Sequence, residues 1–305
     1  MSDTIARPRN RRLRSMAYGM LAAGLVVGGW EAYRRWFGPW LGAEGNEVGT
    51  VLGWKILPRT SANLAMPPVE QMIDELTKPE VRGSSTAVWQ AVLEATLMSL
   101  WLAFAALVLG AVVGLGVAIA MSRFKIVQRG LMPYLVISQT IPLIALAPLT
   151  VTWGGEISFF GFEWQKWTSA VVLGAFLSFF PLAIGATRGF ASPTPAALEL
   201  MESYASSWWS TWRRLRLPSA VPFLLPALRL AGSAAVFGVV VSEISVGYTE
   251  GIGYLTLNYL GEGTARPAKV FSAVLGTIAL GLLMATAVGA LDRFLGRRRP
   301  TQELV

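Results

Sequence analysis

Residues 97–121 read LMSLWLAFAALVLGAVVGLGVAIAM, and none of them carries a charge. A helix needs roughly 20 apolar residues to cross the hydrocarbon core of a bilayer. This stretch is long enough to do so. It therefore predicts a membrane-spanning helix.

Five further apolar runs have a similar length, and together they predict an all-α integral membrane protein with about six transmembrane helices. The first run is the weakest, because Glu31, Arg34 and Arg35 lie at its far end. The basic stretch Arg7–Arg14 before it also fits a secretory signal. We favour a retained span, because a chain with several spans needs no cleaved signal. The six runs are Met16–Trp36, Leu97–Met121, Leu131–Trp153, Trp167–Thr187, Ala220–Val241 and Val270–Leu291.

The composition excludes most enzyme classes. Apolar residues make up 53% of the chain and charged residues only 14%, whereas soluble domains carry about 25% charged residues. Cys and His are both absent, so thiolate nucleophiles, imidazole bases and the common zinc and haem ligands are lacking. None of the lysines follows a glycine, which excludes a Walker A nucleotide-binding loop. We expect a chain that is not an enzyme and that holds no metal or cofactor.

The distribution of basic residues predicts the orientation in the membrane. Cytoplasmic loops carry an excess of Lys and Arg. If the N-terminus is cytoplasmic, 16 of the 26 basic residues fall on the cytoplasmic side. Both termini are then cytoplasmic, and because the charges flank apolar runs, we expect lipid and no nucleic acid as the partner of this positive charge. The 16 residues are Arg7, Arg9, Arg11, Arg12, Arg14, Arg123, Lys125, Arg129, Arg188, Arg213, Arg214, Arg216, Arg293, Arg297, Arg298 and Arg299.

The predicted spans and their orientation divide the chain into five segments, and the extracytoplasmic one contains a further predicted helix. A helix face formed by Val69, Met72, Ile73 and Leu76 after Pro68 predicts a short surface helix outside the membrane. The segments are a cytoplasmic basic arm (1–15), a first transmembrane helix (16–37), an extracytoplasmic segment with amphipathic helices (38–96), a five-helix core (97–291) with a cytoplasmic loop (190–219), and a cytoplasmic tail (292–305).

The loop between the fourth and fifth runs reads FASPTPAALELMESYASSWWSTWRRLRLPS, residues 190–219. Thr194 before Pro195 is a typical helix start. Ser206 and Ser207 fit the cap of a second helix, which begins at Trp208 and which Pro218 limits. An interfacial belt of tryptophan and arginine explains the second helix, but it leaves the apolar face of the first helix without a role.

This loop resembles the EAA loop of permease subunits of ATP-binding-cassette importers. Glu199 falls on the glutamate of the family pattern, and Leu217 and Pro218 fall on its Leu-Pro at the right spacing. The match is partial, because Leu200 and Met201 replace the two alanines, Ala205 the glycine and Leu215 the isoleucine. Alanine resists the left-handed bend that glycine allows. We therefore expect a bend that is wider than in the family or displaced to the serines.

Other stretches resemble the nitrate, sulfonate and taurine branch of these permeases. MPPVEQMIDEL (66–76) is similar to its Leu-Pro-x-Pro helix, and TIPLIALAPLTVTWGG (140–155) to its third span. The resemblance implies the type I importer permease fold, two ATPase subunits that bind ATP and Mg, a second permease chain, which we expect to be identical, and an extracytoplasmic binding protein. The implied cargo is an anion, a sulfonate or a vitamin precursor. The outer insert, residues 42–60, fits the pattern poorly.

Polar and proline residues inside the spans are candidates for the translocation path or a gate. Arg229 lies about eleven residues beyond Pro218, roughly 16 Å along a helix. An intramembrane arginine either serves function or snorkels to the headgroups. Prolines that interrupt helices three and four favour these as pathway walls, and Pro181 is one of them. The other candidates are Gln139, Pro142, Pro148, Ser178 and Glu243.

An ion-coupled secondary transporter is the main alternative function, since an intramembrane arginine suits an anion. Such a carrier has no use for a loop that carries Glu199 and Leu217-Pro218. It also shows inverted repeats in many families, and the sequence has no internal repeat. We therefore favour the importer permease.

Overall fold

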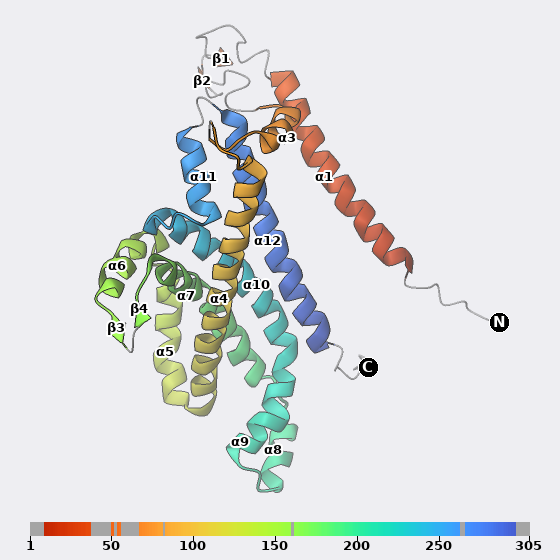
Figure 1. The fold of residues 1–305 in the computed structure, drawn as a ribbon. Helices are drawn as coiled ribbons and strands as arrows, with labels where there is room; N and C mark the ends of the chain where they lie inside the picture. The colour runs from red at the N-terminus through yellow and green to blue at the C-terminus, as the bar shows by residue number, and fades with distance from the viewer. Residues whose placement is uncertain are drawn as a thin grey trace, which may run out of the picture. The chain divides into compact units, whose positions relative to one another are not determined.

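The computed structural model describes residues 9–37, 50–51, 54–55, 67–81, 83–159, 162–262 and 266–296 (Figure 1). The chain forms two compact units: unit 1 contains Met1–Trp89 and Tyr259–Ser272, and unit 2 contains Gln90–Asn258 and Ala273–Val305. Most of the outer insert 42–60 and the last nine residues of the predicted tail lie outside the described residues.

Four helices among the described residues are long and apolar enough to cross a membrane. They contain four of the predicted runs, and their inward faces form the core of unit 2, which includes Leu102, Ala106, Val171, Ala235 and Met284. The predicted first run is helical and lies in α1 (Arg9–Phe37). The four helices are α4 (Val88–Arg123), α7 (Lys166–Phe190), α10 (Leu217–Val246) and α12 (Pro267–Gly296).

Glycine and alanine bring α7 and α10 into close contact. A Cβ added at Gly238 would lie 2.8 Å from the Cα of Gly174, and one at Gly189 would lie 2.7 Å from the Cβ of Ala220. Small residues allow helix backbones to approach closely where lipid supplies no hydrophobic drive. Gly110 and Gly114 of α4 pack on α7 in the same way, so these glycines serve packing within the chain.

The third predicted run is not one straight span. Two helices replace it, α5 (Lys125–Ser138) and α6 (Leu143–Gly155), with a bend of 104° between them. Pro142 lies at the bend as the N-cap of α6, where it disfavours helical backbone at the residue before it. Pro148 and Pro181 lie inside α6 and α7, which continue past them, so of these three prolines Pro142 is the one that lies between two helices.

The described strands form two short antiparallel pairs. Strands β1 (Thr50–Val51) and β2 (Trp54–Lys55) pair antiparallel, as do β3 (Ser158–Phe159) and β4 (Phe162–Glu163). The second hairpin leads to Trp164, whose ring covers Gly154 so closely that a Cβ there would lie 2.2 Å from Nε1. The same Nε1 donates a hydrogen bond to Ser169, which fixes the connection from α6 to α7.

Unit 1 contains the predicted surface helix, α3 (Val69–Thr77), and α1 holds its start. Glu31 accepts a hydrogen bond from the backbone N–H of Val69 (3.1 Å), and Trp30 donates to the carbonyl of Pro67 (3.2 Å). The predicted apolar face was wrong in one respect, because Ile73 is exposed whereas Glu75 is buried.

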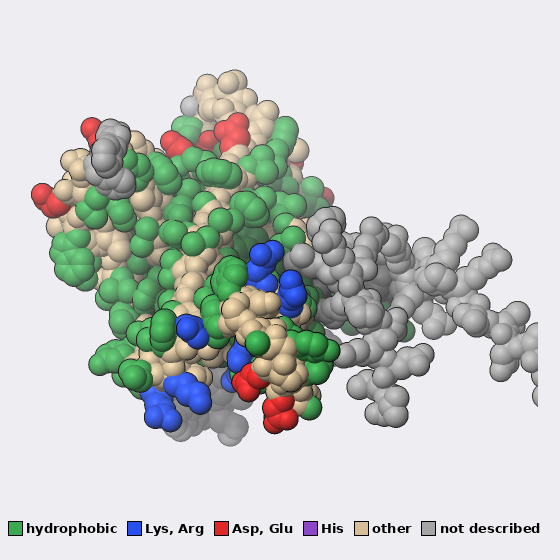
Figure 2. All heavy atoms as spheres, turned by 90° about the horizontal axis from the view of Figure 1, so that it is seen from below, with side chains coloured by type: hydrophobic (Ala, Val, Ile, Leu, Met, Phe, Trp, Pro, Cys, Tyr) green, Lys and Arg blue, Asp and Glu red, His purple; other side chains and the backbone are tan. Residues whose placement is uncertain are grey.

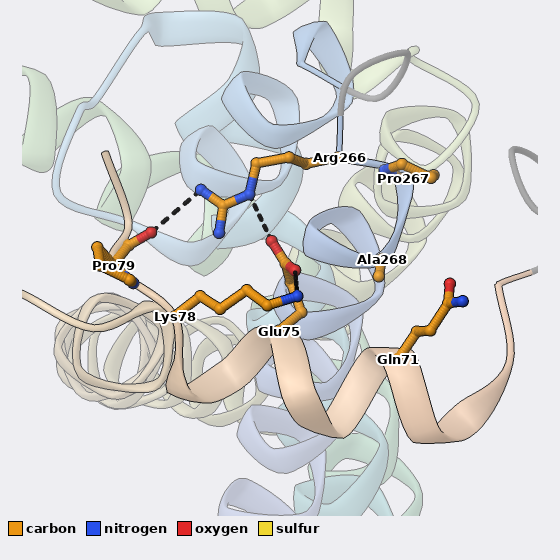
Figure 3. A pocket seen from close by; sticks show the side chains of 7 residues that line it. All are labelled: Gln71, Glu75, Lys78, Pro79, Arg266, Pro267 and Ala268. Atoms are coloured by element: carbon orange, nitrogen blue, oxygen red, sulfur yellow. Dashed lines mark hydrogen bonds and ion pairs between the residues drawn. The ribbon is translucent and has the colours of Figure 1, made fainter. Parts of the chain in front are cut away.

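Glu75 is buried because charged partners surround it (Figure 3). Its carboxylate binds Arg266 and Lys78, and the Arg266 guanidinium also donates to the carbonyls of Pro79 (3.1 Å) and Glu80 (3.0 Å). Lys78 also pairs with Asp74 at 2.8 Å, and the hydrogen bonds to Asp74 and Glu75 raise the pKa of Lys78. Glu75, Lys78, Pro79 and Arg266 line a pocket of about 440 Å³.

Candidate functional site: the α8–α9 loop

The loop begins with the helix that its sequence predicts. Helix α8 (Pro195–Ser203) starts at Thr194, whose hydroxyl accepts a hydrogen bond from the N–H of Ala197 (3.3 Å), and Pro195 occupies its first turn. All nine residues of α8 are described, and none of them is buried. The helix therefore projects from the rest of unit 2, as Figure 1 shows at its lower end.

The bend after α8 lies at Ala205 itself, with φ of +48°. The N–H of Ala205 donates to the carbonyl of Glu202 (2.8 Å), and that of Ser206 donates to Met201 (3.1 Å). These two bonds form a Schellman motif, which closes a helix through a left-handed residue. The expectation that the bend is displaced to the serines was wrong, because the two bonds offset the steric cost that alanine meets in this conformation.

The second helix does not end at Pro218. Ser207 caps α9 (Trp208–Thr211) by accepting from the N–H of Ser210, and a π-helical turn, η2 (Trp212–Arg216), then leads directly into α10. Pro218 lies in the first turn of α10, where a missing N–H is tolerated. The loop is therefore continuous with a helix that runs from Trp208 to Val246.

A cluster of aromatic rings fixes the base of the loop. Trp212 is buried, stacks on Trp209 with ring centroids 5.0 Å apart, and contacts Phe190 at the end of α7. Arg216 donates to the carbonyl of Phe190 (2.9 Å), and the Arg123 guanidinium lies 5.1 Å from the ring of Trp208. An interfacial belt accounts for Trp209, which is 53% exposed, but Trp212 is part of the protein core.

The outer surface of the loop combines apolar and charged groups. Leu200 is 56% exposed and Tyr204 is 75% exposed, and Glu199 is exposed beside them. Met201 and Leu215 are partly buried, whereas Leu217 and Pro218 are exposed. Figure 2, which views this end, shows Lys and Arg side chains gathered around the projecting loop and acidic side chains on it. A base that is fixed by the buried Trp212 thus carries a small, exposed helix.

The candidate path and gate residues lie in four different settings. Gln139, Pro142 and Pro148 belong to the bent pair α5 and α6, and the side-chain nitrogen of Gln139 is buried. Ser178 is buried and donates to the carbonyl of Ala106 in α4 (3.3 Å), which makes it a contact between helices. Two further candidates lie on α10.

Arg229 and Glu243 both lie on α10, but their exposure to solvent differs. Arg229 is exposed, whereas Glu243 is fully buried. Fourteen residues separate them, about 21 Å along the helix. Sequence analysis missed Ser99 of α4, which binds Glu243, because 144 residues separate the two. Gly251 and Gly253, which leave room for the Glu243 side chain, were the local signal of a close contact there. The described residues contain no group of three metal-ligating side chains.

Comparison with known proteins identifies the family. Residues 106–298 match the family described as the inner membrane component of binding-protein-dependent transport systems. The formylaminopyrimidine transport permease protein ThiX of Halalkalibacterium halodurans is 33% identical over 62% of this chain and 71% of its own length. The taurine transport system permease protein TauC of Escherichia coli is 29% identical over 63% of this chain and 66% of its own length.

A solved structure shares the fold. A bacterial ABC transporter involved in the import of the acidic polysaccharide alginate has a chain that aligns with a TM-score of 0.54 at 14% identity, over 93% of this chain and 96% of that chain.

The match over residues 106–298 shows that this chain belongs to the family of binding-protein-dependent inner membrane transport components. It is a transmembrane permease subunit of an ATP-binding-cassette importer for a small solute.

The left-handed conformation of Ala205 leads to a testable prediction about the loop. Ala205→Gly should stabilise the α8 bend by about 1 kcal/mol, because glycine has no Cβ to strain at positive φ. Amide hydrogen exchange of residues 200–206 should then slow about fivefold, since 1.4 kcal/mol is tenfold. Ala197→Gly, the same exchange inside α8, should speed exchange there, because glycine costs up to about 1 kcal/mol in a helix. Faster exchange in Ala205→Gly would show that Ala205 is not strained.

Proposed function

We propose that the α8–α9 loop is the surface through which an ATPase subunit drives this permease. The single observation that carries the proposal is the contrast between the fixed base at Trp212 and the exposed helix α8. A projecting helix with a rigid base transmits force, whereas a loose loop absorbs it. ATP and Mg bind on the partner ATPase, and the residues of this chain contribute contact and movement but no chemical step.

Within the loop the residues divide into three roles. Glu199, Leu200 and Met201 belong to the helix that enters the groove of the ATPase, and Leu200 supplies exposed apolar area. Ala205 sets the angle between α8 and α9 through its left-handed bend. The remaining motif residues join the loop to the membrane helix; they are Leu215, Leu217 and Pro218.

We infer that the loop end of unit 2 faces the cytoplasm. Arg123, Arg188 and Arg213 all lie near helix ends at this side of the unit, and such an excess of positive charge marks the cytoplasmic face. The basic residues near both ends of the sequence support the same side for the two termini. An extracytoplasmic binding protein then delivers solute to the opposite face.

The translocation path is formed by two copies of the chain in this proposal. Phe223, Leu230 and Phe237 are exposed and recur every seven residues along α10, so one face of this helix is open to lipid or to a second copy. Arg229 borders this face, and the bent pair α5 and α6 supplies a second wall. A two-fold contact places identical loops against identical ATPases.

The cargo is a small solute of the anion, sulfonate or vitamin-precursor type. Support comes from the relatives, one named as a formylaminopyrimidine transport permease and another as a taurine transport permease. Because these relatives carry different solutes on similar membrane chains, we assign the selectivity to the binding protein.

Copies with two different tags test the proposed assembly. When both are produced with the ATPase of the system, capture of one tag should recover the other tag as well, with one ATPase chain for each permease chain in total. Quantitative mass spectrometry of the captured chains provides the measurement. Recovery of one copy beside an unrelated permease would contradict the homodimer, and capture without an ATP-binding chain would contradict the proposed function.

A further inference from the structure

Helix α11 (Ile252–Gly261) receives its N-terminal cap from two other helices. Gly251 is its N-cap residue, since its carbonyl accepts the first helical bond, from Leu255 (3.0 Å). A glycine has no side-chain oxygen to satisfy the free N–H groups of the first turn. Ser99 of α4 accepts instead from the N–H of Ile252 (2.9 Å), and Glu243 of α10 accepts from the N–H of Gly253 (2.8 Å).

The two capping side chains also bind each other. The hydroxyl of Ser99 donates to the carboxylate of Glu243 at 2.6 Å, and both side chains are fully buried. The two glycines make room for them: a Cβ at Gly251 would lie 2.2 Å from Cδ of Glu243, and one at Gly253 would lie 2.4 Å from the carbonyl of Val240. Four residues from three helices therefore form one closed contact.

Both carboxylate oxygens of Glu243 accept hydrogen bonds within this contact. Its two oxygens accept from Ser99 and Gly253, and a negative charge is favoured at a helix N-terminus. Its backbone carbonyl meanwhile accepts from the N–H of Gly247 and of Tyr248, which ends α10 with Gly247 in the left-handed region, at φ of +68°. Glu243 thus holds both sides of the turn between α10 and α11.

The contact between Ser99, Glu243 and α11 and the α8–α9 loop lie at opposite ends of one long helical segment. From Trp208 to Glu243 the chain is one continuous helical segment, about 53 Å long at 1.5 Å per residue. The α8–α9 loop joins one end of it, and the contact to α4 and α11 lies near the other end. A continuous helix carries a displacement along its axis, whereas a broken one absorbs it.

We propose that Ser99 and Glu243 are positioning residues that transmit the movement of α10 to α4 and α11 at the end opposite the loop. The inference rests on the proposed function, because the movement originates where the loop meets the ATPase. Neither residue touches the solute in this account. They keep the first turn of α11 fixed to the helix that the ATPase moves.

The experiment compares three variants of the purified complex with its ATPase. Ser99→Ala removes the hydroxyl, and Glu243→Gln replaces one of the two acceptor oxygens with an NH2 group, which donates and cannot accept. Ser242→Ala is the matched control, because Ser242 is equally buried and its hydroxyl donates only to Gly238 of its own helix. Hydrogen exchange of residues 252–256 should rise about fivefold in the first two variants, as loss of a cap costs about 1 kcal/mol, and should not change in Ser242→Ala.

A second measurement separates transmission from local packing. The chain has no cysteine, so Leu257→Cys on the exposed side of α11 can be labelled alone with a methanethiosulfonate reagent. We expect its labelling rate to differ at least threefold between nucleotide-free and ATP-vanadate-trapped complexes. This difference should persist with Ser242→Ala and disappear with Ser99→Ala or Glu243→Gln. A nucleotide effect that survives in both capping variants, or that Ser242→Ala removes equally, would overturn the inference; failure of the ATPase to co-purify at all would instead overturn the proposed function.

Discussion

Glu199→Arg should lower the ATP hydrolysis of the reconstituted complex at least tenfold and release the ATPase from the captured permease. Glu199 lies on α8, whose residues are all at least partly exposed, so the reversed charge alters the surface and leaves the core of unit 2 intact. A lost charged contact in an interface costs about 1.4 kcal/mol or more, which is tenfold. ATPase recovered per permease and hydrolysis per complex are the two measurements.

The matched control is Glu202→Arg, which makes the same change of charge three residues along the same exposed helix. Since only Glu199 falls on the glutamate of the family pattern, this second variant should retain most of the hydrolysis. Equal retention in both variants, at equal abundance in the membrane, would remove Glu199 from coupling. An equal loss in both would indicate a general charge effect of α8.

Gly238→Leu should prevent the folded permease from accumulating. The added Cβ alone would lie 2.8 Å from the Cα of Gly174, which is backbone and cannot move aside. Overpacking of this kind costs roughly 3 kcal/mol or more in a closely packed core. The measurement is the fraction of protein that remains monodisperse in detergent after heating.

Gly281→Leu provides the comparison in another apolar helix, α12. Among the described residues, a Cβ at Gly281 would meet no heavy atom within 4 Å, so this variant should remain close to the parent protein. A Gly238→Leu protein as heat-resistant as Gly281→Leu would contradict the tight contact between α7 and α10.

Local signals in the sequence were sufficient where the structure depends on near neighbours. Thr194 and Pro195 predict the start of α8, and the pair Ser206 and Ser207 predicts a cap for α9, which Ser207 supplies. The capping oxygen and the N–H that it binds lie three residues apart in both helices. Long apolar runs predict the spans for a similar reason, since each helix satisfies its own backbone. The exposed loop that carries Glu199 was predictable from the same local pattern.

Contacts between distant residues were beyond the reach of these signals. The burial of Glu75 depends on Arg266, 191 residues away, so spacing within α3 could not predict it. Pro142 and Pro148 look alike in the sequence, yet only Pro142 lies at the bend of 104°. Ala205 was misjudged because the two backbone bonds that hold its left-handed conformation are a property of the closed loop.

Crosslinking from Leu200 tests the central claim, that α8 enters a groove of the ATPase. A photoreactive amino acid replaces Leu200, which is 56% exposed on the loop, or Trp153 of α6, which is 67% exposed, as the control. Membranes that contain the whole transporter are irradiated, and the crosslinked chains are identified by mass spectrometry. The account predicts that Leu200 crosslinks to an ATP-binding chain with a yield that changes on addition of ATP and Mg, whereas Trp153 does not crosslink to that chain. Absence of any ATP-binding chain from the Leu200 products would contradict it.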